Sequence, residues 1–258
     1  METIAEEKET DKHFEKQPVQ APNKIRLPRR KLTRWLGKLM LAISGGTEDD
    51  LMLHFFQSRP LTPENVIFAY SQGFFPIPDE LGRTRWYDPE ERAIIPLEAF
   101  HIGSRDKRRI RQKNYSVTMD TAFARVIVGC VNSSHREESS WITPAIIETY
   151  TALHEMGVAH SIEIWQDEQL VAGTYGLTIG SYYVGESKFY TVDHMGKVAT
   201  YYLCQSLKES GFLLYDVQYV NGGLAATGAY AIPRADFKKQ LARAIIKPTK
   251  LELTATMP

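Results

Sequence analysis

The chain contains 258 residues, of which 43% are hydrophobic and 24% are charged, and its 31 Lys and Arg residues balance its 31 Asp and Glu residues. This composition is that of a soluble globular protein with one large domain or two small ones. No apolar run approaches the roughly 20 residues that span a bilayer, and the first residues are polar and acidic, unlike a secretion signal. The sequence therefore predicts a cytoplasmic protein without a membrane segment.

Charge is distributed unevenly along the N-terminal region. Residues 1–20 hold six acids against three lysines, whereas residues 24–38 hold seven basic residues and no acid. A basic block of this kind is typical of a nucleic-acid partner, and a solvated basic surface on a neutral protein is an equal alternative. Because no apolar period is sustained here, we expect residues 1–49 to form a flexible charged tail.

The first folded elements are predicted directly after this tail. Thr62 supplies an N-cap and Pro63 a first-turn proline for a short helix whose apolar period ends at Gly73. The next segment is rich in Pro, Gly and acidic residues and contains two short β-prone runs. We therefore assign residues 50–113 to a small N-terminal α+β domain.

Residues 114–248 show a more regular order of elements. Three strand-like runs follow one another at hairpin spacing and predict an antiparallel meander, with helices before and after it. This order favours an α+β fold with helices packed on a largely antiparallel sheet, followed by a C-terminal tail at 249–258. The predicted helices cover 121–131, 144–156, 197–210 and a last segment after Pro233, and the predicted strands cover 161–165, 170–179, 182–189 and 212–220.

Asp216 and Gln218 stand two residues apart in the apolar strand sequence FLLYDVQYV. On a strand both side chains project from one face, while Tyr215, Val217 and Tyr219 project from the other. A polar pair in this position is either an exposed pair on a sheet face or a pair held for chemistry, and the strand alone leaves both interpretations open.

The cysteines and histidines show no metal-ligand spacing. Cys130 and Cys204 are far apart and lack a neighbouring His or Cys, so we expect two reduced, buried cysteines and no metal site. His154, His160 and His194 also lack a partner at ligand spacing, and we expect each to be a hydrogen-bonded structural residue.

Several short motifs, in their order and spacing, resemble the leucyl/phenylalanyl-tRNA–protein transferase family over about residues 65–241. The resemblance implies a small N-terminal domain before a GNAT-like acyltransferase domain, in agreement with the order of elements above. The motifs are AYSQGFFP at 69–76, RWYDPEERAII at 85–95, SRDKRRIR at 104–111, SSWITPAIIETYTALHEMGVAHSIEIW at 139–165, LVAGTYG at 170–176, GESKF at 185–189, YDVQYVN at 215–221 and GAYAIPRADF at 228–237.

The same resemblance implies an activity and its partners. Members of the family transfer Leu or Phe from its tRNA to the N-terminal Arg or Lys of a protein, which creates a destabilising N-terminus for regulated proteolysis. The implied partners are therefore aminoacyl-tRNA and proteins that begin with Arg or Lys. We expect a monomer without a metal or an organic cofactor, because the donor ester already carries the activated bond.

The motifs also imply roles for individual residues. Gln218 is the catalytic residue whose amide oxygen takes a hydrogen of the attacking amine, and Asp216 orients that amide. Glu186 lies at the amino group of the aminoacyl ester; without the motif, a turn glutamate is the simpler interpretation. The other implied substrate contacts are Trp86 and Trp141 at the terminal adenosine, Asn221, Gly185, Ser187, Lys188, Tyr183, Thr174 and Leu203, and the implied tRNA phosphate contacts are Arg105, Lys107, Arg108, Arg109 and Arg111.

Departures from the family pattern gather where the amino acid is selected. The GES motif continues with Lys188, where the family carries a Met of its apolar pocket. The lysine either snorkels out with its stem along the wall or places a cation in the pocket, where it opposes an apolar side chain. The pattern before Lys197 and the residues Gly223 and Ala226 also depart, which puts the amino-acid preference in doubt.

Two other functions stay open on the sequence alone. An acyl-CoA acetyltransferase needs a Gly-rich pyrophosphate loop at the start of the helix after the meander, and TVDHMGK offers only Gly196 there. A non-catalytic relative that binds RNA or N-terminal degrons is suggested by the altered pocket and the basic tail. The retained Asp216, Gln218 and Glu186 argue against this second alternative.

Overall fold

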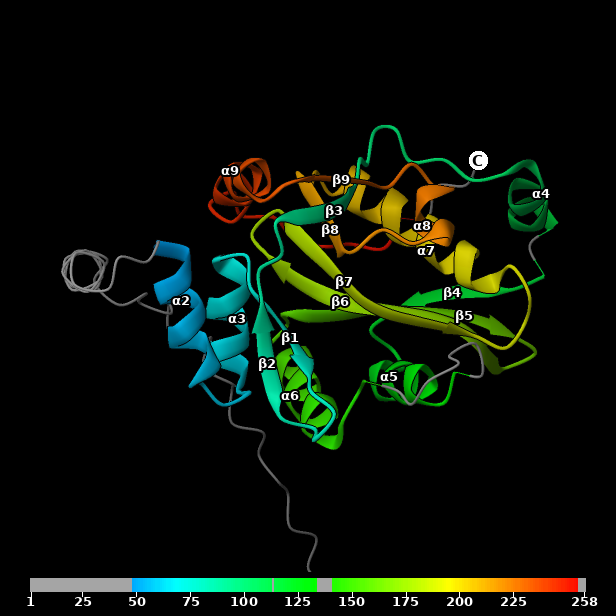
Figure 1. Ribbon diagram of the computed structural model, residues 1–258. Helices are drawn as coiled ribbons and strands as arrows, with labels where there is room; N and C mark the ends of the chain where they lie inside the picture. The colour runs from blue at the N-terminus through cyan, green and yellow to red at the C-terminus, as the bar shows by residue number, and fades with distance from the viewer. Residues whose placement is uncertain (1–47, 113, 134–140, 255–258) are drawn as a thin grey trace, which may run out of the picture. The chain divides into compact units, whose positions relative to one another are not determined.

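A seven-stranded sheet forms the framework of the computed structural model, which describes residues 48–112, 114–133 and 141–254 (Figure 1). Its strands lie in the order β4-β5-β6-β7-β8-β3-β9, and each neighbouring pair is antiparallel except β7 and β8. The predicted α+β fold with a largely antiparallel sheet is confirmed. The strands are β3 (Glu91–Ile95), β4 (Ser116–Met119), β5 (Ala159–Gln166), β6 (Gln169–Ile179), β7 (Tyr182–Tyr190), β8 (Leu214–Gln218) and β9 (Tyr230–Pro233).

The predicted meander is formed by β5, β6 and β7. Asp167 and Glu168 connect β5 to β6 with φ values of +45° and +63°, which is the left-handed backbone of a tight two-residue hairpin turn. Gly180, with a φ of +61°, begins the turn from β6 to β7. Both turns lie where the sequence predicts them, so the register of the meander follows from local turn chemistry.

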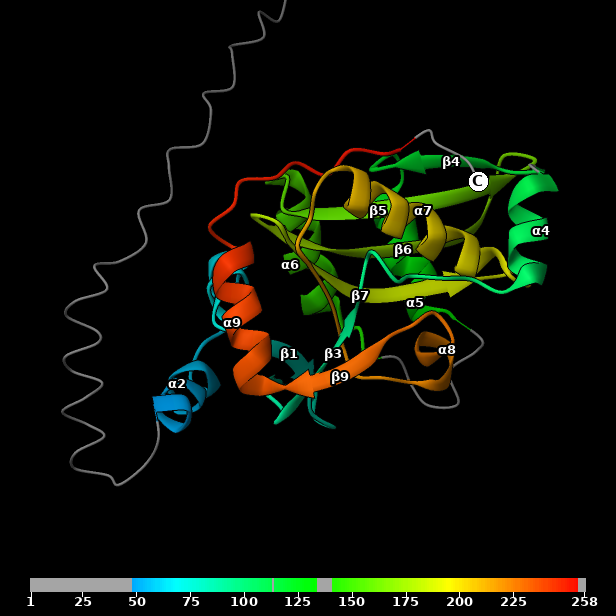
Figure 2. The same ribbon diagram turned by 90° about the horizontal axis from the view of Figure 1, so that it is seen from above.

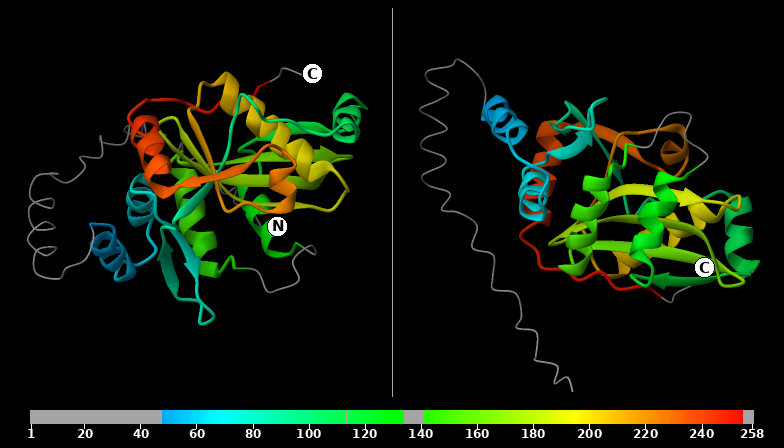
Figure 3. Two further views of the ribbon diagram at one scale, coloured as in Figure 1. Left: turned by 45° about the horizontal axis from the view of Figure 1, so that its top comes forward. Right: turned by 90° about the horizontal axis from the view of Figure 1, so that it is seen from below.

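Helices cover both faces of this sheet. α5 (Phe123–Val131) and α6 (Pro144–Glu155) lie on one face, and α7 (Met195–Glu209) crosses the other (Figures 1 and 2). The view from below in Figure 3 shows α5 and α6 in front of the strands. The buried apolar residues accordingly form two clusters, one with Phe123 and Tyr150 and one with Val198 and Leu207.

Two helices begin at the caps that the sequence predicts. The Thr62 hydroxyl accepts the backbone N–H of Asn65 at the start of α3 (Pro63–Ser71). Thr143 accepts the N–H of Ile146 in the same way at the start of α6. In both helices a proline occupies the first turn, where no backbone N–H is needed.

The segment before residue 91 builds a smaller layer. α2 (Glu48–Gln57) and α3 accompany a separate two-stranded sheet of β1 (Phe75–Pro78) and β2 (Thr84–Tyr87). β3 also falls in the predicted N-terminal domain, but it pairs with β8 and β9 of the large sheet. The domain division at residue 113 stays a prediction, and most of the predicted tail, residues 1–47, lies outside the described residues.

Several elements were not predicted from the sequence, among them α2, β1, α4 (Ser104–Gln112), α8 (Gly222–Ala225) and β9. In α4 only Asp106 and Ile110 are buried, so the helix has no apolar stripe that a sequence pattern can show. α9 (Arg234–Ala244) follows Pro233 as predicted. In the predicted C-terminal tail, Leu251 is buried in the cluster below α7. Within the described ranges, no helix combines the length and the apolar character needed to cross a membrane.

Candidate active site

A buried ion pair joins β3 to β8. Arg92 and Asp216 are 1% and 0% exposed. The guanidinium donates from Nη2 to Oδ2 of Asp216 at 2.7 Å and from Nε to Oδ1 at 2.9 Å. It also donates from Nη1 to the carbonyl of Gly73 at 2.8 Å and lies over the Phe75 ring at 4.3 Å. With a further hydrogen bond from the Tyr182 hydroxyl at 2.6 Å, the carboxylate is fixed in one position.

β8 ends in a strained turn at Gln218. Its φ is +61°, a left-handed conformation that residues with a side chain rarely adopt. The N–H of Tyr219 donates to the carbonyl of Val217 at 2.7 Å and closes a γ-turn around Gln218. The backbone N–H of Gln218 donates to Oδ1 of Asp216 at 2.8 Å. Asp216 therefore stabilises the turn that aims the Gln218 side chain, and strained backbone of this kind is typical of functional sites.

Glu186 on β7 faces two buried phenols. Its Oε1 accepts the hydroxyl of Tyr70 at 2.5 Å, and the phenol oxygens of Tyr70 and Tyr150 are 3.2 Å apart. Burial raises the pKa of Glu186 to about 7, against the lowering effect of the polar groups of Tyr70, Tyr150 and Gln218. The Gln218 side chain therefore lies beside the Glu186 carboxylate.

Glu186 and Gln218 meet where the sheet opens. The parallel pairing of β7 with β8 covers only Tyr182–Val184 against Leu214–Asp216. Both site residues lie two positions beyond the last pair, so their side chains come together at the point where the strands separate. Convergent polar groups at such an opening are typical of a site that binds and orients a substrate.

A bulge in β7 sends Glu186 and Lys188 to opposite faces. The register between β6 and β7 shifts between Tyr175 and Gly176, which leaves Glu186 without a residue opposite it on β6. Glu186 faces α3 and α6, whereas the Lys188 side chain interacts electrostatically with Cys204 of α7. The bulge therefore separates two residues that stand next to each other in the predicted donor motif.

Several residues of the predicted donor site lie in the layer between β7 and α7. Tyr183 and Leu203 are buried in the cluster below α7, and the Tyr183 and Tyr215 rings meet edge-on at 5.2 Å. Gly185 lies against Tyr215, because a Cβ added there would come within 3.2 Å of the phenol. A side chain at this position would therefore push against the wall that Tyr215 forms.

The remaining predicted contacts have local roles. The Thr174 hydroxyl donates to the carbonyl of Ser187 at 3.0 Å across β6 and β7. Asn221 is exposed and is the N-cap of α8, with its Oδ1 accepting the N–H of Leu224 at 3.0 Å. Trp141 is half-buried against the cluster that includes α5 and α6. These positions are compatible with substrate contacts, but the structure gives each of them a structural reason as well.

Trp86 is buried, and the exposed aromatic ring of its motif is Tyr87. Trp86 is 1% exposed and packs on Phe56, with ring centroids 5.7 Å apart. The indole has almost no exposed face in this structure, and the adenosine contact of Trp86 stays a prediction. Tyr87 and Tyr219 are 39% and 50% exposed, and both contact Phe75, at 6.1 and 5.7 Å. The turn at residue 218 breaks the strand alternation, so the predicted placement of Tyr219 on the face of Val217 is also wrong.

One face of α4 carries three of the five predicted phosphate contacts. Arg105, Arg108 and Arg109 are spaced as neighbours on a helix face. Together with Ser104 and His194 they line a cavity of about 370 Å³. Guanidinium groups around a cavity suit a phosphate group, which they can bind through paired hydrogen bonds.

The two other predicted phosphate contacts, Lys107 and Arg111, are exposed but do not line this cavity. The helix is docked on α7 by the buried Asp106 carboxylate. It accepts from His194 Nδ1 at 2.7 Å and from Lys197 Nζ at 3.2 Å. These contacts fix the orientation of α4 on α7. The face with Arg105, Arg108 and Arg109 then lines the cavity, and the face with Lys107 and Arg111 does not.

The histidines have the structural partners that we expected. His154 Nδ1 lies 2.9 Å from the carbonyl of Ala159, and its ring stacks on Phe123 at 4.3 Å. His160 Nδ1 lies 2.7 Å from Oδ2 of Asp120. Both cysteines of the chain are buried, also as predicted. In the part of the chain that the structure describes, no three of these ligand types gather as they would around a metal ion.

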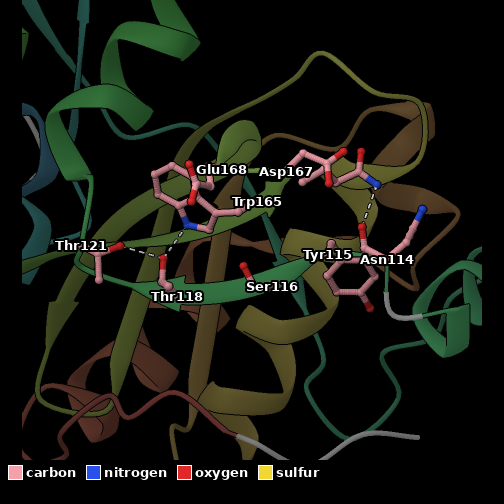
Figure 4. A pocket seen from close by; sticks show the side chains of 9 residues that line it. Asn114, Tyr115, Ser116, Thr118, Thr121, Trp165, Asp167 and Glu168 are labelled. Atoms are coloured by element: carbon pink, nitrogen blue, oxygen red, sulfur yellow. Dashed lines mark hydrogen bonds between the residues drawn. The ribbon is translucent and has the colours of Figure 1, made fainter.

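A further cavity, of about 920 Å³, lies at the β4 edge of the sheet (Figure 4). The Trp165 indole donates to the Thr118 hydroxyl at 2.8 Å, and that hydroxyl donates to the buried Glu163 at 2.5 Å. These polar groups satisfy one another, and β6 and β7 separate this edge from β8. We therefore take Glu186 and Gln218, and not this cavity, as the candidate site.

Sequence reasoning misses three partners in the site. Tyr70 and Tyr150 occupy apolar helical stripes and are indeed buried, but their hydroxyls turn toward Glu186, which a hydrophobic pattern does not reveal. Of these three partners, Arg92 could have been recognised from the sequence, because it places a charge in the otherwise apolar strand sequence RAII. A buried arginine requires a partner, and Asp216 is that partner.

Comparisons with known proteins point to one family. The domain model described as "Leucyl/phenylalanyl-tRNA protein transferase N-terminal domain" matches residues 59–90, and the one described as "Leucyl/phenylalanyl-tRNA protein transferase" matches residues 94–242. Curated relatives with this name are similar over most of the chain. The protein of Salinibacter ruber is 44% identical over 72% of this chain and 80% of its own length. The protein of Herpetosiphon aurantiacus is 42% identical over 73% of this chain and 96% of its own length.

Solved structures show a more distant likeness. FemX has a TM-score of 0.43 and 14% identity, with 56% of this chain and 60% of FemX covered. L-PGS from Bacillus licheniformis has a TM-score of 0.34 and 15% identity, with 62% and 52% covered. A GCN5-related N-acetyltransferase-like protein from Streptococcus suis has a TM-score of 0.31 and 10% identity, with 65% of each chain covered. The family assignment rests on the sequence matches and not on these structures.

Proposed function

The chain belongs to the leucyl/phenylalanyl-tRNA–protein transferase family, and we propose that it joins amino acid to protein where β7 and β8 separate. It is an aminoacyltransferase that uses aminoacyl-tRNA as donor and a protein as acceptor. The observation that carries the proposed site is the convergence of the Gln218 side chain on the Glu186 carboxylate at the strand opening, beside the Asp216–Arg92 ion pair.

Glu186 is proposed to bind the α-ammonium of the aminoacyl ester. An ionised carboxylate in a buried position is a strong acceptor for an ammonium group, because the surroundings do not screen the pair as water does. Tyr70 holds the carboxylate in place by a hydrogen bond, and the Tyr150 hydroxyl lies 3.2 Å from that of Tyr70. Burial raises the pKa of both phenols well above their usual value, so they remain hydrogen-bond donors at neutral pH.

Gln218 is proposed to guide the attacking amine. Its side-chain amide lies beside Glu186, and the carbonyl oxygen of that amide can accept a hydrogen of the acceptor α-amine and align that nitrogen with the ester carbon. The nitrogen then forms a bond to the carbonyl carbon, the carbon–oxygen bond to the ribose breaks, and the proton lost by the amine reaches the departing ribose oxygen. An α-amine with a pKa of about 7.7 to 8.0 is partly neutral at pH 7, so this reaction needs little base strength.

Asp216 acts on this step through the backbone. It is held by Arg92 and accepts the backbone N–H of Gln218 at 2.8 Å. Asp216 is therefore a positioning residue for Gln218 in this proposal, and the buried guanidinium balances its charge.

The donor tRNA is proposed to lie along the arginine face of α4. Arg105, Arg108 and Arg109 line one cavity and can bind backbone phosphates, which contribute most of the affinity of proteins for nucleic acids. Tyr87 and Tyr219 are exposed beside the ion pair and offer rings on which the terminal adenosine can stack.

The natural acceptor is proposed to be a protein with N-terminal Arg or Lys, as the family motifs imply. The added residue makes the N-terminus destabilising for regulated proteolysis. We further propose that the protein acts as a monomer in the cytoplasm. Glu186, Gln218, Asp216 and Arg92 come from one chain, which is compatible with a site formed by a monomer.

A direct assay tests this function. The full-length protein is mixed with charged tRNA and with peptides that are identical except for an N-terminal Arg, Lys, Asp or Ala, and the peptides are weighed by mass spectrometry. We expect addition of one amino acid to the Arg and Lys peptides only. Addition to the Asp or Ala peptide would contradict the acceptor proposal, and binding of charged tRNA without any addition would identify a non-catalytic relative.

A further inference from the structure

β9 is a free edge of the large sheet. It ends the strand order after β3, and in the ranges that the structure describes no strand pairs with its outer side. Tyr230, Ala231 and Pro233 are exposed, and Ile232 packs half-buried against the core. Figure 2 shows the strand along the border of the sheet, between α8 and α9. Its sequence, YAIP, contains none of the charged residues that commonly keep other chains away from a sheet edge.

The pairing of β9 with β3 turns the backbone of Ala231 outward. The N–H of Arg234 donates to the carbonyl of Glu90 at 2.7 Å, which makes the adjacent pair of Pro233 with β3 a non-hydrogen-bonded pair. Because the two kinds of pair alternate along an antiparallel ladder, the pair of Ala231 with β3 is also non-hydrogen-bonded. The N–H and C=O of Ala231 and the C=O of Pro233 therefore point to the free edge. A proline fits at 233, since an N–H there would take no part in the ladder.

These free backbone groups lie level with the reaction centre. Ala93 of β3 pairs with Gln218 on one side and with Ala231 on the other. Adjacent strands are about 4.8 Å apart, which puts β9 about 10 Å from β8 and a strand added to β9 about 14 Å from it. In the proposed function the donor occupies the β7 side of Gln218, where Glu186 lies. The acceptor chain therefore leaves the site on the side of β3 and β9.

We propose that β9 binds the acceptor protein as an added, extended strand, through the backbone of residues that follow its N-terminus. The inference rests on the proposed function and adds a second contact for the same acceptor. An extended chain spans about 3.3 Å per residue, so about the fifth acceptor residue is the first that can pair with β9. In either direction of the added strand, two acceptor N–H groups two residues apart donate to the carbonyls of Ala231 and Pro233. One acceptor carbonyl accepts the N–H of Ala231.

Backbone pairing selects the conformation of the acceptor and not its sequence. The donor and acceptor groups of the backbone are the same for every residue except proline, so any extended segment can bind at this edge. An N-terminus that is already part of a folded element has used these groups and cannot pair again. The protein should therefore prefer acceptors whose first eight or so residues are unfolded.

A second copy of the chain is the other occupant that a free edge can take. The acceptor is favoured because Ala231 is level with Gln218 and within reach of a bound N-terminus. β9 also has only four residues, which is a short edge for a stable dimer. The opposite edge strand, β4, does not suit the acceptor, because it lies beyond β7 on the side of the donor.

The first test measures kcat and KM for Arg-initiated peptides of about three to ten residues, with one charged tRNA as donor. We expect kcat/KM to rise by at least about 5-fold between peptides of four and eight residues and then to level off. The rise should lie in KM, because the reacting amine is the same in every peptide. Transfer that does not depend on length would overturn the inference and leave the proposed function intact. Absence of transfer to every peptide would overturn both.

N-methylation then locates the pairing without changing the protein. A ten-residue acceptor peptide carries one N-methyl group, placed in turn on each residue from the fourth to the ninth. We expect kcat/KM to fall by at least about 3-fold at two positions that are two residues apart, and to change little at the position between them. Equal effects at all positions, or none at any, would contradict an added strand.

A pair of variants tests the edge itself. Ala231→Pro removes the outward N–H, and Ala231→Gly is the matched control that keeps it. Ala231→Pro should lose most of the gain with peptide length, while its transfer to the three-residue peptide stays near wild type and shows that the variant folds. An unchanged length dependence in Ala231→Pro would overturn the inference. A wild-type dimer in sedimentation that Ala231→Pro dissociates would also overturn it and would assign the edge to a second copy.

Discussion

The carboxylate of Asp216 accepts the backbone N–H of Gln218 at 2.8 Å while Arg92 holds its second oxygen at 2.7 Å. The buried Asp216 carboxylate thus connects its ion pair with Arg92 to the γ-turn at the end of β8. The sequence suggested that Asp216 orients the Gln218 side-chain amide. In the structure that amide lies beside Glu186, and Asp216 holds the backbone beneath it.

Replacing Arg92 by methionine should destabilise the fold strongly. The Asp216 carboxylate would remain buried without its cation, which typically costs about 3–5 kcal/mol. Urea denaturation measures this change, and Arg83→Met is the control, because Arg83 is 61% exposed in its pair with Asp79 and should cost less than about 1 kcal/mol. Equal costs for the two variants would contradict the assignment of a critical buried pair.

The double replacement of Arg92 by Met and Asp216 by Leu should separate folding from function. Removing both charges avoids an unpaired buried ion, so stability should recover to within about 1–2 kcal/mol of wild type. Transfer should still be lost, because the γ-turn at Gln218 loses the carboxylate that holds it. A stable double variant with wild-type transfer rates would show that the Asp216–Gln218 hydrogen bond has no role in the reaction.

Donor binding should depend on pH through Glu186. Its pKa is raised by burial to about 7, so the carboxylate that binds an ammonium is present above that pH and lost below it. The α-amine of the donor loses its proton at about 7.7 to 8.0, so affinity should be highest between pH 7 and 8. Fluorescence titration with a hydrolysis-resistant aminoacyl-adenosine measures the profile. Glu186→Gln should abolish the fall in donor affinity on the acidic side of the profile. If the affinity of this variant still fell at low pH, a group other than Glu186 would be responsible for the pH dependence.

The same shift makes a prediction for stability. The pKa of Glu186 is higher in the folded protein than in the unfolded chain, so folding favours the protonated form. This contribution is fully present below about pH 4.5 and is lost as the pH rises through about 7. Glu186→Gln should therefore be more stable than wild type at pH 8, by about 1–3 kcal/mol, and nearly equal to it at pH 5. Thermal unfolding at the two pH values checks the sign, and a larger gain at pH 5 would contradict it.

The two faces of α4 should differ in tRNA binding. Arg108→Ala removes a residue of the cavity, so affinity should fall and the slope of log K against log salt should decrease in magnitude by about 0.7–0.9. Arg111→Ala makes the same charge change outside that cavity and should alter the slope much less. Filter binding at several salt concentrations measures both variants. Equal slopes would mean that net charge matters and that the cavity does not.

The meander and the helix starts could be predicted because local chemistry specifies them. The hairpin turns and the caps at Thr62 and Thr143 depend on a few neighbouring residues. α4 could not be predicted in this way, since it is held by Asp106 contacts to α7 and not by an apolar stripe. β9 was missed because it is short and gains its pairing from β3, which lies far away in sequence.

The candidate site shows the same division. The motifs brought attention to Asp216, Gln218 and Glu186, but only the folded chain shows that Gln218 reaches Glu186 across two strands. The bulge that separates Lys188 from Glu186 is a register shift, and no pattern in GESKF indicates it. The burial of Trp86 was not foreseen, because a motif position does not tell a buried ring from an exposed one.

The most direct test of the site is the single-turnover rate of Gln218→Met, with saturating charged tRNA and an Arg-initiated peptide. Methionine keeps the length of the side chain and removes the oxygen that accepts the amine hydrogen. The account predicts a rate reduced by at least about 100-fold, with donor affinity within about 3-fold of wild type. A folded variant whose rate stays within about 3-fold of wild type would contradict a reaction centre at Gln218.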